Sequence, residues 1–146
     1  MPKSLLPIAL MLWAVNSSAG NAISESEFPR TWEGIFRWHK IFGDQLVDVV
    51  IDTLLIKGPQ ISAKGKGRFL VGEDTTNIQV EWLIDTNTLF IEMWETAPPD
   101  DETGFVTDGS YKGSISNDFK TIFAIWKTNG TDETATLSLK AKDQER

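Results

Sequence analysis

DGSYKGSISNDFKTIFAIWK, residues 108–127, is the stretch that decides the fold. Small or apolar residues alternate with polar ones up to a turn at residues 116–118, and the alternation then resumes as far as Trp126. An alternation with a period of two is typical of β-strands, because successive side chains point to opposite faces. The stretch therefore predicts two antiparallel strands joined by a tight turn.

The same pattern recurs along most of the chain, and helical periodicity is hard to find. We predict eight strands, at Thr31–His39, Gln45–Ile56, Gln60–Val71, Thr76–Ile84, Thr88–Glu95, Gly104–Ser116, Phe119–Thr128 and Glu133–Lys142. Most breaks between them are short and rich in Gly, Pro, Asn and Asp, which is typical of turns, and Thr96–Thr103 is a longer loop.

Short connections make sequential neighbours pair in antiparallel fashion. Eight such strands close well into an up-and-down barrel, because closure removes both exposed edges of the sheet. The predicted fold is therefore an all-β, eight-stranded antiparallel barrel. The alternative is a two-sheet β-sandwich built from the same strands.

The beginning of the chain has the layout of a secretory signal peptide. A positive charge at Lys3 precedes an apolar run over Leu5–Val15, and the small residues Ser17 and Ala19 follow it. The apolar run is about half as long as the roughly 20 residues that a membrane-spanning helix needs.

This layout predicts three segments: a signal peptide over residues 1–19 that is cleaved after Ala19, a flexible polar lead-in over 20–30, and a barrel domain over 31–146. The mature protein is expected to be secreted or periplasmic, with no membrane span after cleavage.

Charge and composition exclude several classes of function. The chain has 146 residues, a formal net charge of −7 and no cysteine. An acidic surface repels the phosphate backbone, so nucleic acid is not an expected partner. Without cysteine the domain must be held by packing alone rather than by disulfides.

The sequence offers little for catalysis or metal binding. His39 is the only histidine, and we interpret it as a residue at the rim of the barrel, so a histidine-based metal site is excluded and no cofactor is implied. A carboxylate pair would need both groups in one cleft, whereas Asp48 and Asp52 lie about 13–14 Å apart along one strand. We predict no catalytic residues and no enzyme activity, with a carboxylate-based hydrolase or isomerase as the least favoured alternative.

Alternation also assigns the faces of the strands. On strand 45–56, the residues predicted to point inward are Val47, Val49, Ile51 and Leu55. The predicted lumen residues are Trp32, Trp38, Phe69, Trp82, Tyr111 and Trp126. The same face carries Gly34, Gly65, Gly67, Gly109 and Gly113. These glycines either make room for the tryptophans in a filled barrel or, together with them, line a ligand cavity.

Three short patterns resemble small exported barrels of the calycin-like kind, such as avidins and lipocalins. They are the Trp-x-Gly-x-Phe-x-Trp start at residues 32–38, the Gly-x-Tyr-x-Gly strand at 109–113 and the Ile-x-Ala-x-Trp strand at 122–126. The resemblance implies a barrel that binds a small, fairly apolar molecule. It assigns no ligand-binding residues to this chain.

Strands 88–95 and 119–128 are apolar on both faces. Their outward side chains Phe90, Trp94, Phe123 and Ile125 would form a patch large enough to indicate a contact surface. Two functions therefore stay open. One is a binder of a small apolar ligand, which needs a cavity of about 300 Å³ or more. The other is a filled barrel that serves as a protein-interaction or homo-oligomerisation module.

Overall fold

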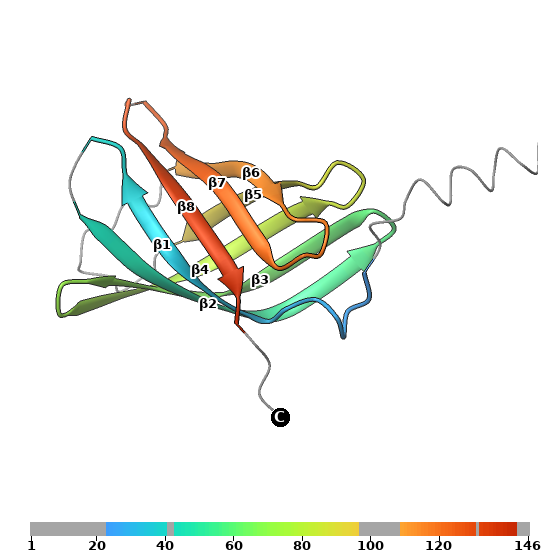
Figure 1. Ribbon diagram of the computed structural model, residues 1–146. Helices are drawn as coiled ribbons and strands as arrows, with labels where there is room; N and C mark the ends of the chain where they lie inside the picture. Colours follow the sequence, from blue (N-terminus) through green and yellow to red (C-terminus); the bar gives the residue numbers. More distant parts are fainter. Residues whose placement is uncertain (1–22, 41–42, 97–108, 131, 143–146) are drawn as a thin grey trace, which may run out of the picture.

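A computed structural model of the protein describes residues 23–40, 43–96, 109–130 and 132–142 (Figure 1). The strands are β1 (Thr31–Trp38), β2 (Asp44–Lys57), β3 (Gln60–Val71), β4 (Asp74–Asp85), β5 (Phe90–Thr96), β6 (Gly109–Ile115), β7 (Thr121–Thr128) and β8 (Thr134–Ala141). Every strand lies where one was predicted. Residues 104–108 of the predicted sixth strand fall outside the described residues.

The strands form one closed antiparallel barrel (Figure 1). Each strand pairs with its neighbours in the sequence, and β8 closes onto β1 through a register in which Trp32 pairs with Ala141 and Trp38 with Ala135. The predicted up-and-down barrel is confirmed. The alternative sandwich is wrong, because the pairing of β1 with β8 leaves no second sheet.

The strands are staggered around the barrel. The stagger is seen by following paired residues once around the barrel, from each strand to its neighbour. A path that starts at Asp85 on β4 and leaves through β5 returns to β4 from β3 at Thr75, which lies 10 residues earlier in the sequence. Such a stagger requires the eight strands to tilt by roughly 40° from the barrel axis. On the way the path crosses one outward-facing residue of each other strand. We call these residues the outer row: Phe90, Ser114, Phe123, Ser138, Ile35, Leu46 and Leu70.

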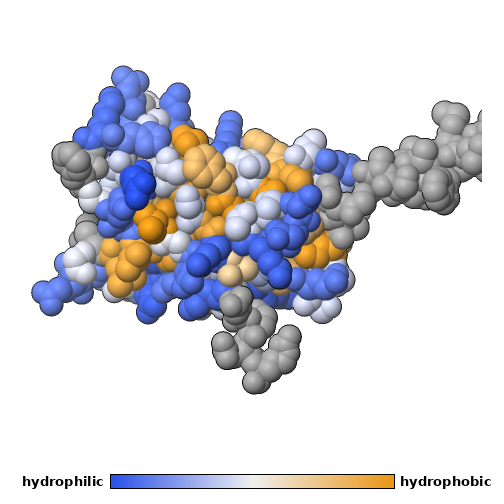
Figure 2. All heavy atoms as spheres, viewed as in Figure 1, coloured by the Kyte–Doolittle hydropathy of each residue, from blue (hydrophilic) through white to orange (hydrophobic). Residues whose placement is uncertain are grey.

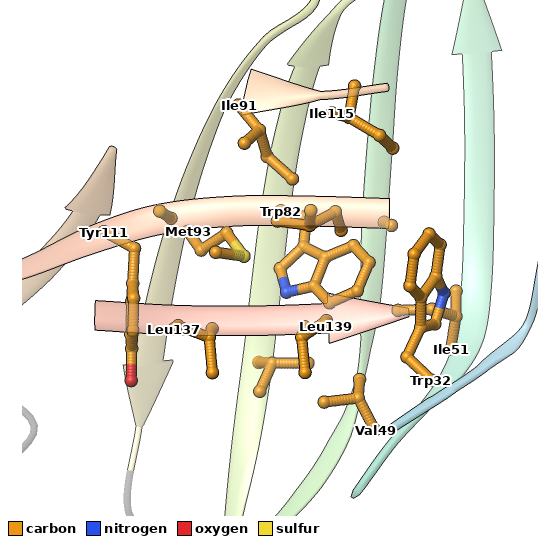
Figure 3. Close-up of a cluster of buried hydrophobic side chains, with 14 of the residues drawn as sticks. Trp32, Val49, Ile51, Trp82, Ile91, Met93, Tyr111, Ile115, Leu137 and Leu139 are labelled. Carbon is orange, nitrogen blue, oxygen red and sulfur yellow. The ribbon is translucent and has the colours of Figure 1, made fainter. Parts of the chain in front are cut away.

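Inward-facing side chains fill the barrel. Figure 3 shows Trp82 in the middle of the interior, with Met93 and Leu139 beside it and Trp32 farther toward one end. The rings of Trp32 and Trp82 meet edge to face with their centroids 5.5 Å apart. Closer to the other end, Phe36 contacts four aromatic rings at centroid distances of 5.1 to 6.3 Å. The core is therefore a continuous stack of interlocking aromatic and branched side chains.

The segment before β1 closes one end of the barrel. Phe28 is 2% exposed, and its ring lies 6.1 Å from that of Trp32 and 6.4 Å from that of Phe119. Residues 23–30 belong to the predicted lead-in; Phe28 and Ile23 pack against the barrel, while residues 24–27 are exposed. The polar composition of the segment concealed this role, because only two isolated apolar side chains, Ile23 and Phe28, provide the packing.

A β-bulge changes the face of the second half of β2. The register against β3 shifts between Ile51 and Thr53, so Asp52 is an extra residue. Beyond the bulge Leu54 is 8% exposed and Leu55 is 52% exposed. The prediction that Leu55 points inward is therefore wrong. Strict alternation counts through the extra residue and assigns the wrong leucine to the core.

The interior glycines serve mainly to bring strands close together. A Cβ atom on Gly34 would overlap the backbone carbonyl of Ser138 on β8, and one on Gly113 would overlap the backbone of β7. Only Gly109 also lies against a tryptophan, with the ring of Trp126 at 2.9 Å from a Cβ placed there. The interpretation that these glycines make room for tryptophans therefore needs correction, because close backbone approach is the common reason.

The predicted signal peptide, with its cleavage site, and the predicted loop after Thr96 lie outside the described residues. In the part of the chain that the structure describes, no helix is long and apolar enough to cross a membrane.

Candidate functional site

The predicted lumen residues fill the interior rather than line a cavity. Trp32, Phe69, Trp82, Tyr111 and Trp126 are each at most 2% exposed, and Trp38 is half-buried. An open lumen would leave its walls accessible to water. The gap enclosed by side chains such as Trp82, Met93 and Tyr111 measures about 10 Å³, which is close to the space of one water molecule.

A polar pair lies at the side of this gap. The hydroxyl of Tyr111 donates a hydrogen bond of 2.7 Å to Oε2 of Glu95, whose side chain points inward from the end of β5. Burial raises the pKa of Glu95 to about 7, although the hydrogen bond from Tyr111 acts in the opposite direction. Burial, together with the nearby carboxylate, also raises the pKa of Tyr111 well above its usual value.

The end of the barrel opposite Phe28 carries Trp38 and His39. The ring of Trp38 meets the ring of Trp126 edge to face at 5.3 Å. His39 is exposed, and its two ring nitrogens lie 2.6 Å from the hydroxyls of Thr134 and Thr136 on β8. Its position agrees with the interpretation as a rim residue, and both nitrogens are occupied by threonine hydroxyls.

A large hollow lies on the outside of the barrel. A groove of about 790 Å³ crosses the outer surface from β6 to β3 by way of β7, β8, β1 and β2. The outer row, except for Phe90, lines it. Leu46 is 57% exposed, Phe123 53% and Ile35 37%. Figure 2 looks onto β1, β7 and β8 and shows apolar atoms gathered among polar ones on this face.

Charged side chains border the groove on both sides. Glu33, Asp48 and Lys140 lie on the side toward the end of the barrel that Phe28 closes. Arg37 and Asp44 lie on the other side and form a double hydrogen bond at 2.9 and 2.8 Å. That contact lowers the pKa of Asp44 and raises the pKa of Arg37. An apolar floor with polar edges is typical of a surface that binds another protein.

The predicted interaction face is only partly brought together. Phe90, Phe123 and Ile125 are 42%, 53% and 38% exposed, and Trp94 is half-buried. Phe123 belongs to the groove. Phe90 and Trp94 line two separate, smaller hollows of about 460 and 310 Å³ on the side of β4 and β5.

Sequence reasoning missed the contribution of β1, β2 and β3 to this surface. Ile35, Leu46 and Leu70 are apolar residues at outward positions of otherwise amphipathic strands, and this was the available signal. Only the register shows that the three are direct partners across the sheet, Ile35 with Leu46 and Leu46 with Leu70. No group of three or more potential metal ligands occurs within the described ranges.

Neither models of known protein families nor curated proteins match this chain. The candidate site therefore depends on the geometry of the barrel itself.

Proposed function

We propose that this protein is an exported interaction module, in which the filled barrel is a rigid scaffold and the outer groove docks a partner chain. The observation that carries the proposal is the contrast between the two sides of the barrel wall. The gap inside measures about 10 Å³, whereas the groove outside measures about 790 Å³ and contains side chains as exposed as Leu46 and Phe123.

The energetics favour a covered groove. Complete burial of a leucine or phenylalanine side chain stabilises a complex by roughly 1.5–3 kcal/mol relative to leaving it in water. Leu46 and Phe123 have more than half of that burial still to gain. Apolar patches with polar edges on a soluble protein mark interaction sites more often than isolated exposed residues do.

The alternative is a calycin-like carrier that holds a small apolar molecule in its lumen. It needs about 300 Å³ or more of internal space. Side chains such as Trp82 and Tyr111 would have to move to create that space, because each is 2% exposed in the filled barrel. The calycin-like resemblance thus supports the scaffold rather than a specific ligand.

The experiment places a photo-crosslinking amino acid at Phe123 in the groove and, as a matched control, at Asn77, an exposed outward position on β4. We expect crosslinked adducts of defined mass from position 123 and none from position 77. Equal yields at the two positions would contradict the proposal. In the same preparation, tryptophan fluorescence should not change with lipophilic compounds, and a saturable change would favour the carrier instead.

A further inference from the structure

We propose that the partner in this groove is a second copy of the chain, packed about a two-fold axis along the outer row, with Glu33 of each copy facing Arg37 of the partner subunit. The inference rests on the proposed function and names the partner of the same groove. It follows from the order of side chains on β1 and from the apolar area that the groove leaves uncovered.

The apolar side chains are arranged for self-pairing. A two-fold axis that lies in the interface and runs along the outer row where it crosses β1 and β2 reverses the direction of the strands and places Ile35 and Leu46 each opposite its own counterpart. Ile35 and Leu46 are direct partners across the sheet, so the two copies would bring four apolar side chains together, with Ser138 beside Ile35. The axis thus keeps the apolar floor of one groove on the apolar floor of the other.

The charges on β1 fit the same axis. Glu33 and Arg37 lie two residues before and after Ile35, on the same outer face and about 6–7 Å from it along the strand. Reversal of the strand brings Glu33 opposite Arg37 of the partner subunit, and symmetry repeats the contact. Nε and Nη2 of Arg37 already donate to Asp44, so Nη1 remains to donate a charge-assisted hydrogen bond to Glu33 of the partner subunit.

The remaining charges on the groove edges do not oppose this arrangement. Asp48 would face Asp44 of the partner subunit, but each aspartate already has an arginine in its own chain. Arg68 lies 2.7 Å from Asp48, and Arg37 lies 2.8 Å from Asp44. The two like charges therefore approach each other as neutralised pairs.

The uncovered area suits a small, reversible dimer. The large exposed apolar residues that line the groove, Ile35, Leu46 and Phe123, are between 37% and 57% exposed. At roughly 100 Å² each they expose about 300 Å² of apolar surface, since a whole phenylalanine side chain buries about 150–250 Å². A standard interface buries about 800 Å² per partner and is somewhat more than half apolar, so this dimer is expected at the weak end of the range.

A second axis must be distinguished from this one. A two-fold axis parallel to the strands, between β8 and β1, would bring Glu33 opposite Lys140 of the partner subunit. It would also place the ion pair of Arg37 and Asp44 against Ile125 of the partner subunit, which would remove water from the pair without adding a polar contact. The axis along the outer row avoids that cost.

The test compares charge reversals by sedimentation velocity of the mature protein over a wide range of concentration. We expect the wild type to dimerise, and Glu33→Arg and Arg37→Glu each to weaken dimerisation by about tenfold or more, because like charges then face each other. The double variant E33R/R37E restores the pairing and should dimerise more tightly than either single variant, but not fully, because Asp44 has lost its arginine. Lys140→Glu is the matched control on the same edge and should have little effect.

Thermal unfolding checks that each variant keeps the fold, which is expected because exposed ion pairs contribute little to stability. A wild type that stays monomeric at all concentrations overturns the inference, while adducts from position 123 with a different protein would still support the groove as a docking site. If neither charge reversal changes the dissociation constant of the dimer, or if Lys140→Glu changes it instead, the contact between Glu33 and Arg37 of the partner subunit is wrong.

Discussion

Glu95 is the residue whose chemistry depends most on the barrel wall around it. Its carboxyl group points inward and accepts a hydrogen bond from the hydroxyl of Tyr111, and burial raises its pKa to about 7. The folded protein therefore binds the proton of Glu95 more tightly than the unfolded chain does. It follows that the contribution of Glu95 to stability is greatest below the unfolded pKa, near 4.5, and is lost as the pH rises through about 7.

Replacement of Glu95 by glutamine should remove this pH dependence while keeping an oxygen for Tyr111. Between about pH 5 and pH 8 the wild type should lose about 2 kcal/mol of unfolding free energy relative to the variant, because one unit of pKa shift corresponds to 1.36 kcal/mol and the side chain keeps some exposed surface. Urea unfolding at several pH values measures the difference. If the unfolding free energies of the two proteins changed in parallel with pH, Glu95 would have the same pKa in the folded and unfolded states.

Gly34 tests why glycine occurs inside the strands. Substitution to alanine should destabilise the barrel by about 3 kcal/mol or more, because the new Cβ would overlap the carbonyl of Ser138 and force β1 away from β8. Gly67→Ala is the control, since a Cβ there meets only the side chains of Ile78 and Val80, at 3.2 to 3.3 Å, and these can shift. Denaturant unfolding should rank Gly34→Ala well below Gly67→Ala, and a reversed order would refute the close-approach explanation.

At the level of elements, β2 shows how one extra residue redirects half a strand. The bulge at Asp52 turns Leu54 inward and Leu55 outward. Leu54→Ala should cost about 2–4 kcal/mol of unfolding free energy, whereas Leu55→Ala should cost about 0.5 kcal/mol or less. Equal losses in thermal or urea unfolding would mean that the strand continues without the bulge.

The same element shows where sequence reasoning works and where it stops. The positions of the strands were predictable because alternation and turn residues are local signals, and β3 carries its predicted bounds, Gln60–Val71. The bulge was not predictable, because it depends on the register against β3 and on no residue type in particular. The packing of Phe28 on the barrel was missed for a related reason, since Ile23 and Phe28 are isolated apolar residues in a polar segment and show no periodicity.

For the whole molecule, the topology was predictable from eight strands joined mostly by short turns, whereas the occupancy of the lumen was not predictable from the sequence. Whether aromatic side chains fill a barrel or line a cavity depends on stagger and on how closely neighbouring backbones approach. Here the contacts of Phe36 and Trp82 leave about 10 Å³ in the middle. The outer row could not be predicted from the sequence either, because Phe123 and Leu46 are joined in one row only by the pairing of strands that lie far apart in the sequence.

The seam between β1 and β8 has a consequence for how the chain reaches this state. Trp32 pairs with Ala141, so the first strand to be synthesised finds one of its two neighbours only when the last strand has been made. Contacts between residues so far apart in sequence close large loops and slow folding. The sheet of a growing chain therefore keeps two unpaired edges, one of them on β1, until β8 has been synthesised. A protein that binds the unfolded chain would have to act before β1 and β8 pair.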